Sequence, residues 1–286
     1  MKKIVTLNDL PRYSHWPARL MGIDKWEQRK KNPKEINREY EHEKWGPLLE
    51  RVKQTGGKVT IDEVNEWQLD CLSDMLCAKG LHALDILGPA EAYLCYMELV
   101  ENTLRKYLPA TALVELGAGY GSIILPLAKK HPFSGTNIIA GEYTKSGAQL
   151  IKTLAKNENL KVSSGRCDFN TEPLTDLSIP EGALFYTSYA ICYVPTLDNN
   201  HIDRLRSYKP SVVVHFEPCY EHHDPATLLG LMRRRYIEVN DYNINLVSIL
   251  NQQQKANKIK IIAEQSSVFG NNPFLPISII VWAPIT

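Results

Sequence analysis

The chain has 286 residues, of which 44% are hydrophobic and 23% charged, and its formal net charge at pH 7 is +1. This length and composition suit one sizeable α/β core with an extra layer or cap, and they exclude overall disorder. A near-neutral charge gives no general argument for a nucleic-acid partner, which usually requires a basic domain or stripe. We therefore expect a globular protein with no nucleic-acid partner.

The cysteines form no CxxC pair, which argues against a zinc framework and against a disulfide scaffold. The six residues are Cys71, Cys77, Cys95, Cys167, Cys192 and Cys219. No apolar run reaches the roughly 18 to 20 residues that span a bilayer, and the N-terminus has no apolar core of signal-peptide length. We expect a cytoplasmic location, a reducing compartment and no membrane partner, while the oligomeric state stays open.

The first part of the chain, residues 1–109, is rich in Trp, Arg, Glu and Lys and has a mostly helical pattern. The expected helices are Lys34–Gln54, Ile61–Lys79 and Ala90–Tyr107. We predict that this region folds over the functional site as a helical substrate cap, because closing a site excludes water and fixes alignment. Packing is the alternative role of its aromatic and basic side chains, which include Tyr13, His15, Trp16, Arg19, Trp26, Arg38, Tyr40 and Trp45.

From residue 110 onward, strands and helices alternate. The expected strands are Ala112–Leu116, Asn137–Glu142, Lys161–Arg166, Gly182–Thr187 and Ser211–Glu217. Helical segments such as Gly121–Lys130 and Lys145–Asn157 lie between them, which predicts an α/β fold with a mostly parallel sheet. The runs Lys258–Glu264 and Pro276–Ala283 have no helix between them and are predicted to form an antiparallel hairpin at the sheet edge.

An acid and three glycines separate the first of these strands from the following helix. The strand ends in Glu115, and Gly117, Gly119 and Gly121 follow at every second position. Glycine lets the backbone turn sharply and approach a ligand without a Cβ clash, and the start of a helix offers free N–H groups. We predict a ligand-binding loop, with close packing as the structural alternative. The spacing differs from the GxGxxG of a nicotinamide site.

Acidic and aromatic residues also follow the next two strands. Glu142 ends the second strand, about twenty residues after the glycine loop, where a carboxylate can accept hydrogen bonds from ribose hydroxyls. Asp168 and Phe169 follow the third strand, where they could hold an exocyclic amine and stack a purine. The alternatives are a helix cap for Glu142 and an ordinary turn for Asp168 and Phe169.

From about residue 113 to the C-terminus, these features resemble the class I S-adenosylmethionine-dependent methyltransferases. The resemblance implies a Rossmann-like fold with a reversed last strand, S-adenosylmethionine as the cofactor, and a methyltransferase domain over residues 110–286. It implies that Glu115 orients the methionine amino group, Glu142 binds the ribose and Asp168 binds the adenine N6. The implied cofactor site comprises Glu115, Gly117, Gly119, Gly121, Glu142, Tyr143, Asp168, Phe169 and Ser188.

The fifth strand supplies the catalytic candidates His215 and Glu217, either of which could accept a proton from the nucleophile. A buried strand position satisfied by a neighbour is the alternative for His215. The segment His222–Asp224 could bind a metal, but adjacent histidines seldom converge on one ion, so no metal site is predicted. The substrate-binding candidates, for which helix capping or packing is the alternative, are Tyr189, Tyr242, Asn243 and Asn245.

We expect an N- or O-methyltransferase of biosynthesis that acts on a small molecule or a peptide. The fourth strand ends in Tyr186–Ala190 without the acid-or-Asn-Pro-Pro-aromatic signature of many nucleobase and glutamine methyltransferases, which disfavours those substrates. Methylation of a peptide or protein side chain or terminus is the close alternative. A non-catalytic cofactor-binding module is a further alternative. A nicotinamide-dependent oxidoreductase is disfavoured by the glycine spacing and by the lack of a Tyr-x-x-x-Lys dyad in the second half of the sequence.

Overall fold

One nine-stranded sheet organises the computed structural model, in the order β2-β1-β8-β9-β7-β6-β3-β4-β5. The structure describes residues 5–28, 30–70, 72–80, 83–171, 174 and 176–285. The strands are β1 Met75–Lys79, β2 Ala83–Leu87, β3 Ala112–Leu116, β4 Asn137–Glu142, β5 Val162–Arg166, β6 Leu184–Ser188, β7 Val212–Pro218, β8 Ile259–Gly270 and β9 Ile277–Pro284. Cys71 lies outside the described residues.

The five central strands, β3 to β7, pair in parallel, and β9 then runs antiparallel to β7. β8 pairs antiparallel with β9. This arrangement confirms the predicted Rossmann-like α/β fold with an antiparallel C-terminal hairpin. The hairpin is not at the sheet edge, however, because the far end of β8 pairs with β1.

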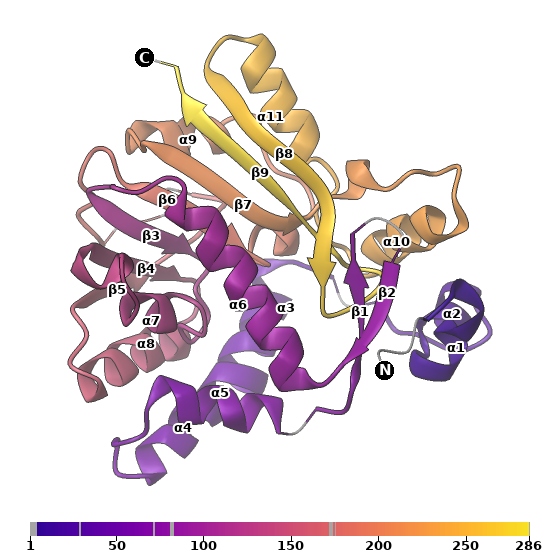
Figure 1. Cartoon of the computed structure of the whole chain (residues 1–286), viewed down its shortest axis with the longest axis horizontal. Coiled ribbons are helices and arrows are strands. Elements are labelled where there is room, and N and C mark those ends of the chain that lie inside the picture. The colour runs from indigo at the N-terminus through magenta and orange to yellow at the C-terminus, as the bar shows by residue number, and fades with distance from the viewer. Residues whose placement is uncertain are drawn as a thin grey trace.

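The first part of the chain adds strands that the sequence reading missed. The predicted helix Ile61–Lys79 ends at Leu69, and Met75–Lys79 forms β1. β1 pairs antiparallel with β2, and Ala78 and Lys79 pair with the end of β8. Figure 1 shows this hairpin extending the sheet beyond β8, away from β5. The N-terminal region is therefore helical and sheet-forming, rather than helical alone.

Helices pack on both faces of the sheet. They are α1 Leu10–Tyr13, α2 Trp16–Leu20, α3 Pro33–Asn37, α4 Gly46–Gln54, α5 Ile61–Leu69, α6 Pro89–Arg105, α7 Ile124–Ala128, α8 Lys145–Asn157, α9 His201–Ser207, α10 Leu228–Val239 and α11 Leu246–Lys255. No helix in the described ranges is long and apolar enough to cross a membrane.

The predicted helix Lys34–Gln54 is observed as α3, a π-helical segment and α4 in direct succession. The π-helical segment is Arg38–Trp45, and the Gly46 N–H that ends it donates to the Glu41 carbonyl, five residues earlier. Pro47 follows and has no N–H to donate, so the wider turn leaves no donor unsatisfied at this point. The turn matters because it directs Tyr40 and Trp45 toward the carboxyl ends of the parallel strands.

Hydrophobic cores lie on both faces of the sheet. Side chains of α4 to α8 pack against one face around Leu113 and Val214, and Figure 1 shows α6 crossing this face diagonally. Side chains of α9 and α11 pack against the other face around Val114 and Val213. Because α4 and α5 share their core with β3, the N-terminal region and the parallel strands are packed as one body.

Candidate functional site

A cavity of about 890 Å³ opens at the carboxyl ends of β3, β4, β5 and β6. Ligands of open α/β sheets bind at this end of the strands. Nine of the residues predicted from the sequence line it: Glu115, Gly117, Gly119, Glu142, Tyr143, Asp168, Phe169, Ser188 and Tyr189. The structure therefore brings together residues that lie up to 74 positions apart, from 115 to 189.

The glycine loop has a backbone that other residues would strain. Gly117, Gly119 and Gly121 all have positive φ, at 80°, 58° and 90°. A Cβ on Gly117 would lie 2.5 Å from the Ala190 Cβ, so this position also needs glycine for space. Gly121 does not line the cavity; a Cβ there would meet Leu125 at 2.8 Å. The loop shape is thus set by these glycines.

Glu115 is a buried carboxyl at the base of the cavity. It is 2% exposed, and its Oε2 has no hydrogen-bond partner among the described residues. Burial raises the pKa of Glu115 to about 8. A buried carboxyl with a free oxygen at a cavity wall is suited to bind a cationic group, which would supply the missing partner and favour ionisation.

Glu142 shapes the loop as well as lining the cavity. Its Oε2 accepts a hydrogen bond from the Gly119 N–H at 2.9 Å. Its Oε1 accepts from the Thr144 N–H at 3.0 Å and from the Thr144 hydroxyl at 2.7 Å. Burial nevertheless holds the pKa of Glu142 above its usual range. Because each carboxylate oxygen has two acceptor directions, Oε2 retains one for a ligand hydroxyl.

Asp168 and Phe169 lie together at the end of β5. Asp168 Oδ1 accepts from the Asn170 N–H at 3.0 Å, and its Oδ2 lies 3.5 Å from Arg166 Nη2. The Phe169 ring reaches Gly117, since a Cβ there would lie 3.6 Å from Phe169 Cε2. A planar ligand could therefore stack on Phe169 with its polar edge toward Asp168.

Two phenols, one from α6 and one that follows β6, line the same cavity near Ser188. Tyr96 of α6 has its hydroxyl 2.6 Å from Ser188 Oγ, and its ring centroid lies 5.8 Å from that of Tyr189. Tyr189 has φ at 48°, which is unusual for a residue other than glycine, and its hydroxyl donates to the Leu275 carbonyl. Strained backbone of this kind is found at ligand sites when the surroundings fix it.

The catalytic candidates on β7 do not line the cavity. His215 is fully buried, with Nδ1 3.0 Å from the Thr187 hydroxyl and Nε2 accepting from the Trp282 indole N–H at 2.9 Å. Burial lowers its pKa to about 3. Both ring nitrogens are occupied within the core, so His215 is placed as a packing residue and not as a proton acceptor for a substrate.

Glu217 is also fully buried and serves the loop after β6. Its Oε1 accepts from the Ala190 and Ile191 N–H groups, at 2.9 and 3.0 Å, and its Oε2 accepts from the Cys192 N–H at 3.2 Å. Three backbone donors therefore hold this carboxyl against the loop that follows β6. Glu217 positions the residues that follow Tyr189, and the predicted direct role in proton transfer is not supported by its placement.

The substrate candidates that follow α10 lie outside the cavity lining. Asn243 Nδ2 donates to the Val194 carbonyl at 2.7 Å, and Asn245 binds both the N–H and the carbonyl of Leu197. These amides fasten the segment after β6 to the start of α11. The Asn243 Oδ1 also accepts from the Leu246 N–H at 2.9 Å, which agrees with the capping alternative for Asn243. Tyr242 stands behind the cavity wall, with its ring centroid 5.6 Å from that of Tyr193.

No protein-family model matches this chain, and no curated protein matches it. Among solved structures, it is similar to geranyl diphosphate C-methyltransferase from Streptomyces coelicolor A3(2), with 13% identity, a TM-score of 0.44, and coverage of 66% of this chain and 78% of that chain. Magnesium protoporphyrin IX methyltransferase (ChlM) from Synechocystis PCC 6803 shows 12% identity and a TM-score of 0.47, over 69% of this chain and 87% of that chain.

The [4+2]-cyclase SpnF is similar at the same level, with 11% identity and a TM-score of 0.47 over 66% of this chain and 81% of that chain. Similarities with such low identities and TM-scores assign neither a reaction nor a substrate. The function must therefore be inferred from the geometry of the cavity.

The N-terminal region supplies one wall of the cavity. The sequence predicts a cap from this region but indicates few of the residues that line the cavity. Its lining residues, of which Tyr40 and Trp45 were named as cap candidates, are Lys31, Asn32, Pro33, Ile36, Tyr40, Lys44, Trp45, Tyr93 and Tyr96. Trp45 lies over the glycine loop, because a Cβ on Gly119 would be 3.2 Å from Trp45 Cζ2. Lys31, Lys44, Tyr93 and Tyr96 were missed; the signal for the two tyrosines was their spacing of three on one face of α6.

Within the described part of the chain, no group of three or more His, Cys, Asp or Glu side chains could hold a metal ion. His222 pairs instead with Ser278 and Glu264. His223 is buried at 2% exposure, and burial lowers its pKa to about 3. The segment His222–Asp224 is thus part of the local packing of the turn before α10.

Proposed function

We propose that this chain is an S-adenosylmethionine-dependent methyltransferase that acts on nitrogen or oxygen of a small molecule or a peptide. The single observation that carries the proposal is that Glu115, the glycine loop, Glu142 and the Asp168–Phe169 pair all line one cavity at the carboxyl ends of parallel strands. The class I resemblance assigns a part of the cofactor to each of these positions. The reversed strand β9 agrees with the same family.

The residues fit the cofactor chemically. Glu115 has an unsatisfied buried oxygen for the methionine ammonium, and Gly117 lines the cavity beside it at a position where Ala190 leaves no room for a Cβ. Glu142 has one acceptor direction left for a ribose hydroxyl, and Asp168 with Phe169 suits the adenine edge and face. Together the acids complement the positive charge of a sulfonium ligand.

When bound, the cofactor supplies an electrophilic methyl group on a sulfonium sulfur. The chain's own residues then align the nucleophile with that methyl group and keep water away. Ser188 and Tyr189, at the end of β6, line the same cavity, and Glu217 fixes the loop that follows them. We further propose that residues 1–109 form the substrate cap of a methyltransferase domain at 110–286, because Tyr40 and Trp45 line the same cavity.

The first test is binding of S-adenosylhomocysteine by isothermal calorimetry to the wild type, Glu115→Ala and Asp168→Ala. Both variants should bind at least about tenfold more weakly, since each loses a charge-assisted hydrogen bond. Glu50→Ala is the control, because Glu50 is exposed on α4, pairs with Lys53 and does not line the cavity. Unchanged affinity in both site variants would show that the proposed pocket is wrong.

Methyl-labelled S-adenosylmethionine and a cell extract then test catalysis. Label in a small metabolite supports the small-molecule form of the proposal, and label in a peptide or protein makes the N-terminal region a peptide clamp. Cofactor binding without transfer to any substrate supports the non-catalytic alternative. A cytoplasmic location and the absence of nucleic-acid and membrane partners stay predictions.

A further inference from the structure

We propose that the methyl acceptor is an oxygen that is already an anion at neutral pH, a carboxylate or an acidic phenol, held between Lys31, Lys44 and the tyrosines of the cavity. This inference rests on the proposed methyltransferase function and narrows its substrate class. It follows from how charge is divided between the two halves of the cavity and from which side chains could accept a proton.

The two halves of the cavity differ in their charged residues. The acids Glu115, Glu142 and Asp168 line the half assigned to the cofactor, together with Arg166, which pairs with Asp168. The half formed by the N-terminal segment contributes Lys31 and Lys44 and no acidic lining residue among those described. A ligand that reaches this half from the sulfonium side therefore meets positive charge, which attracts an anion.

The two lysines share a single carboxylate. Glu39 Oε2 lies 3.2 Å from Lys31 Nζ, and Glu39 Oε1 lies 2.7 Å from Lys44 Nζ. Burial alone would raise the pKa of Glu39, but the hydrogen bonds and charges of the lysines hold it below its usual value. The group therefore carries one net positive charge, two ammonium groups against one carboxylate. The Lys31 side chain is only 7% exposed, so solvent screens this charge weakly.

The substrate half lacks a general base among the described residues that line it. His215 and Glu217, the predicted bases, are buried behind the cavity with their polar atoms bonded within the core. Under the proposed function, the Glu115 carboxylate binds the cofactor ammonium and does not serve as a base. The other two lining acids are already hydrogen-bonded, Glu142 to Gly119 and Asp168 to Asn170.

The phenols of this half cannot serve as bases. Burial raises the pKa of Tyr40, Tyr96, Tyr189 and Tyr193 above the usual value, so these hydroxyls keep their protons at neutral pH. A protonated phenol can donate to an anionic oxygen but cannot remove a proton from an alcohol or an ammonium. Because Tyr189 already donates to the Leu275 carbonyl, the shared lysines are the groups best suited to hold an acceptor that arrives ionised.

The reaction balances without a base. A lone pair of the acceptor oxygen forms the new C–O bond to the methyl carbon, and the electron pair of the broken C–S bond stays on sulfur. The anionic acceptor and the sulfonium cation become a neutral methyl ester or ether and a neutral thioether. No proton is released, whereas methylation of an alcohol, an amide or an ammonium releases one.

Probe ligands test the charge preference without requiring turnover. Benzoate, benzylamine and benzyl alcohol are titrated calorimetrically into the protein saturated with S-adenosylhomocysteine. Benzoate should bind at least about tenfold more tightly than the other two, because charge-assisted hydrogen bonds to ammonium groups favour it. Equal binding of the three probes, including no binding of any, or a preference for benzylamine overturns the inference.

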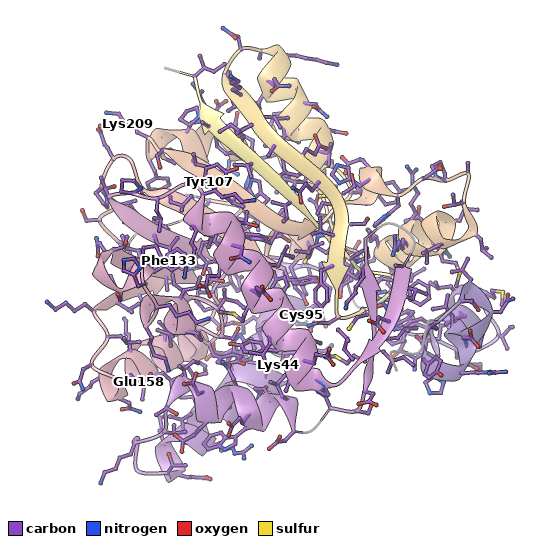
Figure 2. The ribbon with its side chains drawn as sticks, viewed as in Figure 1. Lys44, Cys95, Tyr107, Phe133, Glu158 and Lys209 are labelled. Carbon is purple, nitrogen blue, oxygen red and sulfur yellow. The ribbon has the colours of Figure 1, made fainter. Side chains whose placement is uncertain are left out.

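Lysine variants test whether Lys31 and Lys44 cause the preference for benzoate. Lys31→Gln and Lys44→Gln should each weaken benzoate binding several-fold, while Lys31→Arg retains it because the charge is kept. Lys209→Gln is the matched control, since Lys209 is exposed and pairs with Glu181 away from the cavity; Figure 2 labels both Lys44 and Lys209. Benzoate affinity that is unchanged in both lysine-to-glutamine variants would contradict the proposed binding role.

The chemistry of the labelled product separates this inference from the proposed function. Label that becomes volatile as methanol in mild alkali identifies a carboxyl methyl ester, and alkali-stable label on an aromatic oxygen identifies a phenol ether; either supports the inference. Label on nitrogen or on an aliphatic hydroxyl overturns it and leaves the methyltransferase proposal intact. Failure to bind S-adenosylhomocysteine overturns both.

Discussion

At pH 7 the carboxyl group of Glu115 carries its proton when no cation lies beside it, because burial raises its pKa to about 8. A ligand ammonium favours the ionised form, so binding must expel that proton. The same shift affects stability: as pH rises from the usual pKa of 4.5 to about 8, the unfolded carboxyl ionises before the folded one does. Without ligand, the free energy of unfolding contributed by this group therefore falls over that range.

We predict that affinity for S-adenosylhomocysteine rises between pH 6 and 8, by at most about tenfold per pH unit, because binding releases a proton from Glu115. Calorimetry in two buffers of different ionisation enthalpy measures the proton count directly. Glu115→Gln cannot ionise and should bind weakly with a flat dependence on pH. Proton release that persists in this variant would assign the effect to another group.

At Gly117 the cost of backbone strain can be separated experimentally from the cost of the steric clash with Ala190. Gly117→Ala should lose S-adenosylhomocysteine binding and destabilise the protein by about 1–3 kcal/mol, since alanine is strained at φ 80° and its Cβ meets Ala190. Gly22→Ala shares a positive φ of 74° but has open space, so it should cost about 1 kcal/mol or less. Urea unfolding and calorimetry measure both effects. Equal losses in the two variants would mean that the contact with Ala190 is unimportant.

At the scale of elements, the sequence predicted best where local pattern decides the structure. β3, β4 and α8 begin and end where predicted, because uninterrupted apolar runs and an amphipathic period specify them. β1 was missed because its apolar residues continue the helical period of α5, and only pairing with β2 and β8 makes them a strand. His215 and Glu217 lie on the predicted strand but outside the cavity lining, and the sequence pattern could not reveal this because their hydrogen-bond partners come from distant elements.

The π-helical segment is attached to α8 by one acidic side chain. Glu41 Oε1 accepts from the Ser146 hydroxyl at 2.5 Å, and Glu41 Oε2 accepts from the Ser146 N–H at 3.1 Å. Glu41→Ala should raise hydrogen exchange of residues 38–45 about tenfold and leave the protection of β3 and β4 unchanged. Mass spectrometry resolves the two regions, with Glu50→Ala as the exposed control. Equal exchange in the variant and the wild type would argue that Trp45 packing alone holds the segment.

For the whole molecule, the predicted boundary at residue 109 does not divide the hydrophobic core. Leu48 and Val52 of α4 pack in the same core as Leu113, and β1 covers the end of β8. We predict that residues 110–286 alone lack cooperative unfolding and associate through the uncovered edge and core face. Near-ultraviolet circular dichroism and size-exclusion chromatography measure this against the full chain. A monomer with a sharp thermal transition would show that the second part folds independently.

The segment formed by residues 31–45 forms one wall of the cavity and rests on the glycine loop through Trp45 and on α8 through Glu41. Under the proposed function, we expect the spent cofactor to leave when these contacts open. Lids that seal a site often make product release, rather than chemistry, the slow step. The rate of repeated turnover would then depend on how often residues 31–45 move away from the glycine loop, and not on the residues beside the reacting atoms.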